Sequence, residues 1–337
     1  MDIPCKTMSS PPTPALRCEY TTQPADQLLA SEHALAVFTF NGTTETSNDP
    51  RLTHTGLKQV SDKPSVQEVW YSNQPVNYGC AESVNWAQSG EYLFCSLLLE
   101  ERADTSLAEA SMQAYNTLLH FISNKGFPHI LRAWNYFSAI NEGVDDAERY
   151  KEFCLGRHDA FQKIAEKDLS LILPAACAIG HDAQKGCVYL LAAKNAGTNF
   201  ENPEQISAYH YPRDYGPRSP SFARATLAKM TTGSCLYVSG TASIKGHTTI
   251  SPGNANEQLL VTLDNIDRLL THIAKTAKLP ITPKMNIVKV YIRRAEYFEL
   301  LRHTVNAHFN EAQIVFLESD ICRKELEVEI DGACYLP

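Results

Sequence analysis

The segment from Tyr209 to Ala225 gathers side chains that could bind an anion. It reads YHYPRDYGPRSPSFARA and contains three arginines, three tyrosines, three prolines and one glycine. Proline restricts φ and Gly216 permits a turn, so the pattern predicts a stiff loop. A guanidinium offers a two-pronged donor to a planar carboxylate, and a phenol offers an oriented one. The alternative is a structural loop whose arginines pair with acidic residues elsewhere in the protein.

A second group of candidates lies near the C-terminus, where acidic and apolar residues alternate. The acidic positions are Glu325, Glu327, Glu329 and Asp331. A period of two predicts a strand over residues 326–330 with the acids on one face. One buried carboxyl in such a row could act as a general acid, because burial and neighbouring carboxylates raise its pKa. A solvated acidic edge would explain the same spacing.

Composition limits the partners of this 337-residue chain. Its 30 basic and 38 acidic side chains leave a formal net charge of −8, whereas nucleic acids and anionic membranes attract broad basic surfaces. A small basic pocket for an anionic metabolite remains compatible with that charge. The proline-rich start lacks the apolar segment of a secretory signal. The most apolar stretch, 169–180, contains Pro174 and is shorter than the ~20 residues of a membrane span. We expect a cytoplasmic protein without nucleic-acid or membrane partners.

Several signatures of common enzyme classes are missing. The chain has no GxGxxG after a predicted strand, no GxxxxGK[ST], no HExxH and no GxSxG, which counts against nucleotide, metalloprotease and serine-hydrolase chemistry. Its ten cysteines include no CxxC pair and its eleven histidines no convincing ligand pair. The cysteines are therefore predicted to be reduced thiols. An enzyme built on this chain is expected to work without a metal or other cofactor.

The hydrophobic pattern predicts the same order of elements twice. In the first stretch, strands are expected over 92–99, 130–140 and 187–191, with helices over 107–121 and 146–165. In the second, strands are expected over 235–238, 287–292, 314–317 and 326–330, with helices from 251–254 onward and over 295–308. We predict an α/β fold of two duplicated halves, each a mixed sheet with helices packed on one face. The expected divisions are a proline-rich, weakly structured lead-in over 1–30, an N-terminal half over 31–200 and a C-terminal half over 201–337.

The C-terminal stretch resembles the Rid (reactive-intermediate deaminase) proteins. The resemblance lies in VSG (238–240), LDNIDRLLTHIA (263–274), IVKVYI (287–292) and IVFLESDICRKELEVEIDGA (314–333). It implies a Rid-like fold for each half and an active-site cleft between the halves. Rid proteins are trimers with clefts between subunits, so we expect a monomer or a homo-oligomer, including a trimer.

Longer motifs are similar to those of the chorismatase family. They are YHYPRDYGPRSPSFARA (209–225), GSCLYVSGTASIKGH (233–247), RAWNYFSAIN (132–141), ERYKEFCLGRHDAF (148–161) and, more weakly, VNYGCAESVNW (76–86). The resemblance implies cofactor-independent cleavage of chorismate to pyruvate and a hydroxybenzoate. Chorismate carries two carboxylates and an acid-labile enol ether. Its cleavage would require cations that seat both carboxylates and an acid that protonates the methylene carbon of the ether.

The resemblance assigns roles to individual residues. It implies that Glu329, the acid of the VEI triplet, is the general acid/base and that Cys322 steers the ring toward 3-hydroxybenzoate. Ala242 in SGTAS would leave room for the ring. The residues that fit carboxylate binding are Tyr211, Tyr215, Arg218, Arg224 and, from the other half, Arg157. Cys322 could instead be an ordinary small apolar residue.

Three other functions stay open from the sequence. A hydrolytic chorismatase would release a dihydroxycyclohexadiene carboxylate, and related enzymes also release 4-hydroxybenzoate. The Rid-like strands would also allow an imine deaminase, although the arginine-rich loop argues against it. The third alternative is a non-catalytic protein that binds an aromatic acid.

Overall fold

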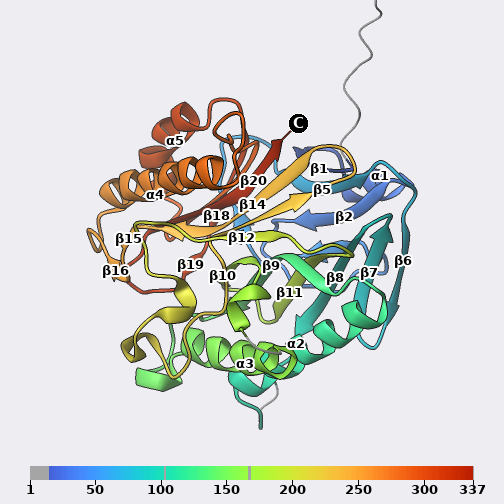
Figure 1. Ribbon diagram of the computed structural model, residues 1–337, viewed down its shortest axis with the longest axis horizontal. Coiled ribbons are helices and arrows are strands. Elements are labelled where there is room, and N and C mark those ends of the chain that lie inside the picture. Colours follow the sequence, from blue (N-terminus) through green and yellow to red (C-terminus); the bar gives the residue numbers. More distant parts are fainter. Residues whose placement is uncertain (1–14, 102–103, 166–167, 337) are drawn as a thin grey trace, which may run out of the picture.

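The computed structural model describes residues 15–101, 104–165 and 168–336. Three β-sheets surround one central apolar core, and long helices cover the outer faces of the two larger sheets (Figure 1). The predicted mixed α/β class is thus confirmed. Within the described ranges, no helix combines the length and the apolar character needed to cross a bilayer.

The first large sheet carries the helices of the N-terminal half. In spatial order its strands are β19 (Asp320–Ile321), β10 (Ala175–His181), β9 (His129–Ser138), β11 (Gly186–Ala193), β8 (Tyr92–Leu99), β7 (Val84–Ser89) and β6 (Asn77–Ala81). The helices are α2 (Leu107–Asn124) and α3 (Arg149–Ile164). Helix α2 begins after Ser106, which forms a capping box with Glu109 and so satisfies backbone donors at the helix start. Its apolar stripe packs on the sheet as the spacing predicted.

The second large sheet belongs mainly to the C-terminal half. In spatial order its strands are β12 (Thr198–Phe200), β13 (Ala225–Lys229), β14 (Ser234–Ala242), β20 (Val328–Leu336), β17 (Ile287–Ile292), β18 (Gln313–Glu318) and β4 (Lys58–Gln59). The helices are α4 (Ala255–Thr276) and α5 (Tyr297–His308). The predicted α4 stripe, from Leu259 to Ile273, is buried against the sheet.

The predicted duplication is visible in the connectivity of these two sheets. The strand order β7-β8-β11-β9-β10 in the first corresponds to β13-β14-β20-β17-β18 in the second. The pairs β9–β10 and β17–β18 are parallel, whereas the other corresponding pairs are antiparallel. Helices α2 and α4 follow the corresponding strands β8 and β14, and α3 and α5 follow β9 and β17. Both copies therefore have one fold.

Each large sheet receives its outermost strand from the opposite part of the chain. The short strand β19 pairs antiparallel with β10, and β4 pairs antiparallel with β18. The two sheets also meet directly, since the backbone N–H of Ala176 on β10 donates to Ser239 Oγ on β14 at 2.8 Å. The two halves are therefore joined by exchanged edge strands and by a direct hydrogen bond between the sheets.

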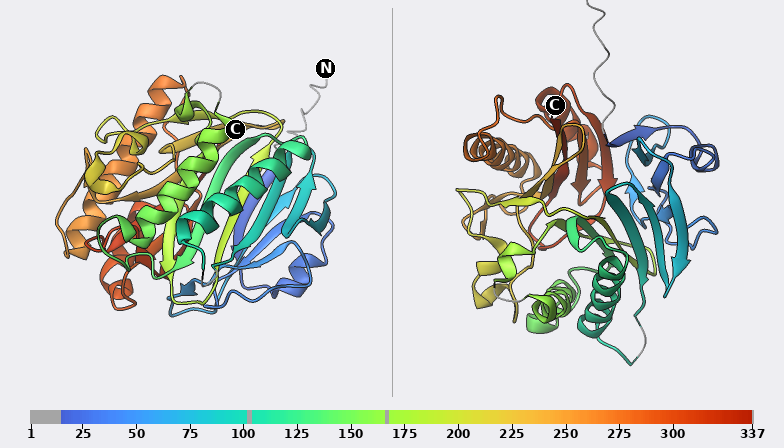
Figure 2. Two further views of the ribbon diagram at one scale, coloured as in Figure 1. Left: turned by 90° about the horizontal axis from the view of Figure 1, so that it is seen from below. Right: turned by 45° about the vertical axis from the view of Figure 1, so that its right-hand side comes forward.

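A third, four-stranded sheet lies beside the two large ones (Figure 2). It is formed by β1 (Leu16–Thr21), β5 (Gln67–Ser72), β2 (Ala34–Thr39) and β3 (Leu52–His54), with the short helix α1 (Ala25–Leu29). The predicted weakly structured lead-in is therefore wrong for residues 16–29. Leu16 and Cys18 alternate into the central core while β1 pairs with β5. Residues 1–14 of that prediction lie outside the described residues.

The acidic strand near the C-terminus is central. Strand β20 lies between β14 and β17, and Glu329 and Asp331 are only 4% and 1% exposed. The solvated acidic edge considered from the sequence is therefore excluded. Two buried carboxyl groups on one strand need a local arrangement that compensates their desolvation.

Candidate active site

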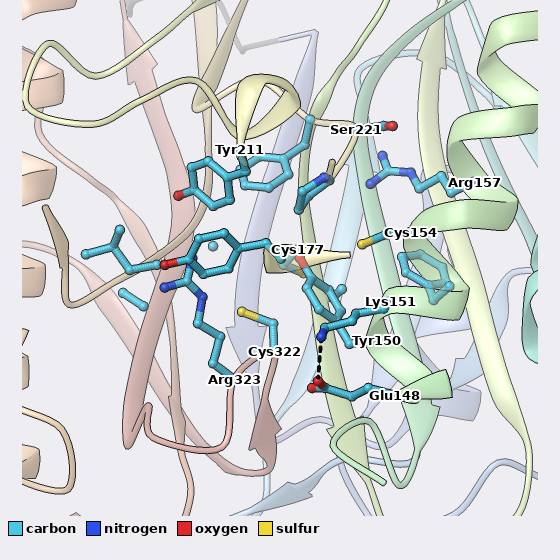
Figure 3. Close-up of a pocket in the computed structure, with 18 of the residues that line it drawn as sticks. Glu148, Tyr150, Lys151, Cys154, Arg157, Cys177, Tyr211, Ser221, Cys322 and Arg323 are labelled. Atoms are coloured by element: carbon cyan, nitrogen blue, oxygen red, sulfur yellow. Dashed lines mark ion pairs between the residues drawn. The ribbon is translucent and has the colours of Figure 1, made fainter. Parts of the chain in front are cut away.

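A cavity of about 460 Å³ lies between the two halves, within the usual size range of small-molecule sites. Its floor is formed by β10, β14 and β20. Figure 3 shows α3 along one wall, with Cys322 and Arg323 on the other side and Tyr211 of the arginine-rich loop above. The cleft between halves that the resemblance implied is present. Seven of the eight predicted site residues line it: Arg157, Tyr211, Tyr215, Arg224, Ala242, Cys322 and Glu329.

The carboxyl group of Glu329 reaches this cavity from the start of β20. Ala242 is its partner on the adjacent strand β14, so the two side chains are neighbours at the floor. Strand β14 carries a register shift between Val238 and Thr241, an irregularity typical of strands beside active sites. Within it, Gly240 leaves room for the carboxyl group, because a Cβ there would lie 1.9 Å from Glu329 Oε1.

The surroundings of Glu329 favour its protonated form. Burial, followed by the nearby charge of Asp331, raises its pKa to about 8, although Arg132 and Arg224 act in the opposite direction. A carboxyl group of this pKa keeps its proton at neutral pH and can give it to a bound molecule. The sequence reasoning expected such a shift for Glu329.

Arg157 supplies an uncompensated cation on the α3 wall. Its guanidinium lies over the rings of Tyr115 and Phe161, with the carbon Cζ 5.1 and 5.4 Å from the ring centroids. The side chain is 3% exposed, and its Nε and Nη2 atoms have no hydrogen-bond partner. Buried donors without partners are rare in proteins because they lose hydration without compensation. Arg157 lines the cavity, so its positive charge lies beside an anion bound there.

Arg224 supplies a second buried cation from the arginine-rich loop. Its Nη2 donates to Tyr211 Oη at 2.8 Å and to the Ile206 carbonyl at 3.2 Å. The Nε atom is buried without a partner. The predicted loop thus presents one arginine and its supporting tyrosine to the cavity.

The other arginines of the loop have a structural role. Arg218 does not line the cavity; it is about half exposed and lies 3.7 Å from Asp159 of α3. Arg213 forms an ion pair with Asp146, also in the N-terminal half. The prediction that Arg218 binds a carboxylate does not fit this placement, because its guanidinium points to the acidic side of α3. Both residues form the ion pairs with acidic residues of the N-terminal half that the alternative interpretation expected.

Arg323 is a cavity residue that the sequence reasoning missed. Its guanidinium carbon lies 4.1 Å from the centroid of the Tyr215 ring, and Nη1 donates to the His247 carbonyl and to Thr249 Oγ1. These last two residues belong to a small hairpin of β15 (Ile244–Lys245) and β16 (Thr248–Thr249). Tyr215 is therefore part of the wall mainly as a support for Arg323. The only hint of Arg323 in the sequence was its position directly after Cys322, a predicted site residue.

Cys322 lies at the cavity in a well-anchored loop. Arg293 donates to the carbonyls of Ile321, Arg323 and Leu326, which fixes the backbone around the thiol. Burial raises the pKa of Cys322 far above its ordinary value, so the side chain is a neutral thiol. It can shape the cavity or donate a weak hydrogen bond, but it is not a thiolate nucleophile.

Other cavity residues lie on α3 and at its N-terminal end. They are Glu148, at the start of the helix, Lys151 and Cys154, which precede Arg157 at intervals of three residues. Lys151 Nζ lies 3.8 Å from Glu148 Oε2 at the mouth (Figure 3). The helical spacing was a usable signal for them. Ser221 also lines the cavity and is buried with a hydroxyl that has no hydrogen-bond partner. No pattern in the sequence pointed to this residue.

Among the described residues, no three His, Cys, Asp or Glu side chains are grouped so that they could hold a metal ion. The nine described cysteines are all free thiols.

Comparisons with known proteins agree with this geometry. The family model "Chorismatase FkbO/Hyg5-like, N-terminal" matches residues 68–192. The chain is 36% identical over 278 residues to a 3-hydroxybenzoate synthase of Streptomyces hygroscopicus, covering 79% of this chain and 80% of the relative. It is 31% identical over 346 residues to a chorismatase of Streptomyces rapamycinicus, covering 96% and 99%. A crystal structure of a chorismatase superposes with a TM-score of 0.86 at 30% identity, covering 96% of this chain and 100% of the other. With its fold, its interdomain cavity and these relatives, the chain belongs to the chorismatase family of enzymes.

Proposed function

We propose that this enzyme cleaves chorismate to pyruvate and a hydroxybenzoate, mainly 3-hydroxybenzoate, without a cofactor. The observation that carries the proposal is one cavity that combines a protonated carboxyl group with two buried guanidinium groups. Glu329 has a pKa of about 8, while Arg157 and Arg224 have unpartnered donors. A small dianion with an acid-labile ether needs this combination. We also propose that the enzyme works in the cytoplasm, with no nucleic-acid or membrane partner.

The proposed reaction begins with proton transfer. Glu329 protonates the methylene carbon of the enolpyruvyl group, which creates an oxocarbenium ion, and the resulting Glu329 carboxylate stabilises that cation. The neighbouring ring hydroxyl displaces the side chain, which leaves as pyruvate. The proton of that hydroxyl returns to the Glu329 carboxylate. Opening of the strained ring intermediate breaks one carbon–oxygen bond, and the ring proton lost on aromatisation is balanced by protonation of the freed oxygen, which gives 3-hydroxybenzoate. Arg157 and Arg224 hold the two carboxylates throughout.

The outcome of the reaction is proposed to depend on the floor and on one wall of the cavity. Ala242, opposite Glu329, leaves space for the ring, and the neutral Cys322 thiol lies beside it in the lining. The relative named 3-hydroxybenzoate synthase supports aromatisation over hydrolysis. Direct elimination to 4-hydroxybenzoate is compatible with the same residues as a second route.

The decisive test is a product analysis with the purified protein and chorismate, with no added cofactor. Chromatography should detect equal amounts of pyruvate and hydroxybenzoate, and ultraviolet spectra separate an aromatic ring from the diene of a hydrolytic product. A diene product would show that the enzyme is a hydrolase and not a lyase. Binding of chorismate without turnover would leave only a binding protein, and turnover of imines alone would indicate a deaminase.

The substitution Cys322→Ala is expected to change the product ratio more than the total turnover. The thiol is neutral and held at the cavity wall, so its loss changes how the ring is seated and leaves the proton donor intact. The ratio of 3- to 4-hydroxybenzoate and diene should be measured by chromatography beside total pyruvate. Cys322→Ser is the matched control for side-chain volume. An unchanged product profile in both variants would remove Cys322 from the mechanism.

The substitution Gly240→Ala is expected to reduce turnover about 10²-fold, the usual result of moving a reacting group by about 1 Å. The added Cβ would collide with Glu329 Oε1 and must push the carboxyl group away from its position. Gly246→Ala is the control, because an added Cβ there meets no atom within 4 Å although its φ of +58° carries strain. Equal rates for both variants would show that the Glu329 position does not limit the reaction.

A further inference from the structure

A buried ion pair lies behind the cavity floor. Asp331 follows Glu329 by two residues on β20 and therefore projects from the same face of the strand. Its Oδ2 lies 2.6 Å from Nη2 of Arg132 on β9, in the other half, and both side chains are only 1% or 2% exposed. Tyr291 Oη donates to the same oxygen at 2.9 Å. Neither Asp331 nor Arg132 lines the cavity, so neither touches a molecule bound there.

These contacts commit the negative charge to Asp331. A guanidinium and a phenol both donate to its carboxylate, and hydrogen bonds of this kind stabilise the ionised form. Tyr291 is held in turn by Tyr136, whose hydroxyl lies 2.8 Å away, and Tyr136 by Tyr189 at 3.2 Å. The arrangement cannot turn its donors toward Glu329 without breaking this chain of contacts.

Glu329 has the opposite surroundings. Among the described residues no basic nitrogen forms an ion pair with its carboxyl group within 4.0 Å. The cations that act on it, Arg132 and Arg224, donate through Nη2 to Asp331 and Tyr211. Arg132 Nη1 and Arg224 Nε have no partner, so neither of these donors forms a hydrogen bond with Glu329. One proton shared by two neighbouring buried carboxyl groups therefore resides on Glu329.

Three further groups near Glu329 are neutral, whereas the cation on α3, Arg157, lines the same cavity. Cys177 comes from β10, Cys322 from the anchored loop and Tyr150 from α3, and burial raises the pKa of each. They are uncharged at neutral pH. Asp331 is thus the acidic side chain whose charge acts on Glu329.

We propose that Asp331, fixed as a carboxylate by Arg132 and Tyr291, is a positioning residue that keeps the proton on Glu329 between turnovers. The inference rests on the proposed role of Glu329 as the general acid. It assigns a function to a residue that does not contact the substrate and that acts by its charge alone. Each time Glu329 has given up its proton, the fixed neighbouring charge favours its reprotonation.

The test is the pH profile of kcat/KM for Asp331→Asn with chorismate. Activity requires protonated Glu329, so in the unsubstituted enzyme it falls as pH rises through about 8. Removing the neighbouring negative charge, and freeing Arg132 to act on Glu329, should move that alkaline limb down by about one pH unit or more. At pH values below the alkaline limbs of both enzymes, kcat of Asp331→Asn should stay within about threefold of the unsubstituted enzyme and KM should not change. An alkaline limb that stays in place or moves upward overturns the proposal.

Two controls separate charge from packing and from the proposed function. Tyr291→Phe disturbs the same buried contacts without removing a charge, and its limb should stay within about 0.3 pH unit of the unsubstituted enzyme; an equal shift in both variants would overturn the charge argument. Glu329→Gln tests the proposed function separately, because it removes the acid itself. If Glu329→Gln is inactive and the Asp331→Asn limb does not move, only the role of Asp331 fails.

A measurement on the unsubstituted protein covers the case in which Asp331→Asn does not fold. Carbon-13 NMR of side-chain carboxyl groups, with Glu329 assigned by its absence in Glu329→Gln, follows each group through a titration. The Glu329 signal should move near pH 8, because the proton lies on Glu329 at neutral pH. The reverse assignment, with the proton on Asp331, would overturn the proposal.

Discussion

Glu329→Gln is expected to lower the rate of pyruvate release from chorismate by at least about 10³-fold, the usual worth of a positioned general acid. Glutamine keeps the size of the side chain but cannot donate a proton to carbon. The remaining cavity, including Arg157 and Arg224, stays intact, so the loss should appear in kcat and only weakly in KM. Coupled detection of pyruvate in steady-state and single-turnover experiments measures both. Full retained activity would remove Glu329 from the mechanism.

The stability of the same variant provides its control. Because the folded-state pKa of Glu329 is about 8 and its ordinary value is 4.5, the folded protein holds a proton that the unfolded chain loses between these values. The free energy of unfolding therefore falls as pH rises from 4.5 to about 8, by an amount on the order of a few kcal/mol. Glu329→Gln lacks this dependence and should unfold at a higher temperature than the unsubstituted enzyme at pH 8. A variant that is inactive but more stable has lost chemistry and not structure.

Arg224→Gln is expected to raise KM for chorismate roughly 100-fold, since a buried charge pair with the substrate is lost. The substitution also removes the hydrogen bonds of Nη2 to Tyr211 and Ile206, so the thermal stability of the free variant should be measured beside KM. Arg218→Gln is a matched control from the same loop. Its side chain is half exposed beside Asp159 and outside the cavity, so KM should change less than about twofold. Equal effects of both variants would contradict the division of the loop into a binding and a structural part.

Local sequence patterns were sufficient for the long helices and for the central strands of the two large sheets. The apolar runs at 92–99 and 287–292 are strands with those bounds, and the α4 stripe from Leu259 to Ile273 is buried. The sequence predicts these elements because each buries an apolar face against a neighbouring layer, and such a face produces a regular apolar pattern along the chain. The topology of the two large sheets then follows from the repeated order of elements.

What the sequence did not reveal depends on contacts between distant segments. Strand β10 lies in the apolar stretch that was considered only as a membrane candidate, and β4 and β19 contain two residues each. Such short strands have no pattern of their own and exist because a partner edge pairs with them. The early strand β1 was missed for the same reason, since β5 is 46 or more residues away along the chain.

The candidate site, like the fold, could be predicted from the sequence only in part. Spacing alone placed Glu329 in a row of four acids without distinguishing it from its neighbours, and only the family resemblance selected it. The distinction is physical but non-local: Asp331 meets Arg132 of the other half, whereas Glu329 meets a cavity. Arg218 and Arg224 lie in one sequence motif but in different surroundings. Arg218 lies beside Asp159 of α3, whereas Arg224 lines the cavity.

The exchanged edge strands make the two copies of the duplication inseparable. Strand β19 is encoded with the second copy but completes the sheet of the first, and Cys322 follows it directly. A gene fragment that encoded either copy alone would expose an unpaired sheet edge, which favours aggregation. The two copies can therefore no longer evolve as independent modules. A substitution in β10 that shifts its edge also shifts β19 and, with it, the position of Cys322 at the cavity.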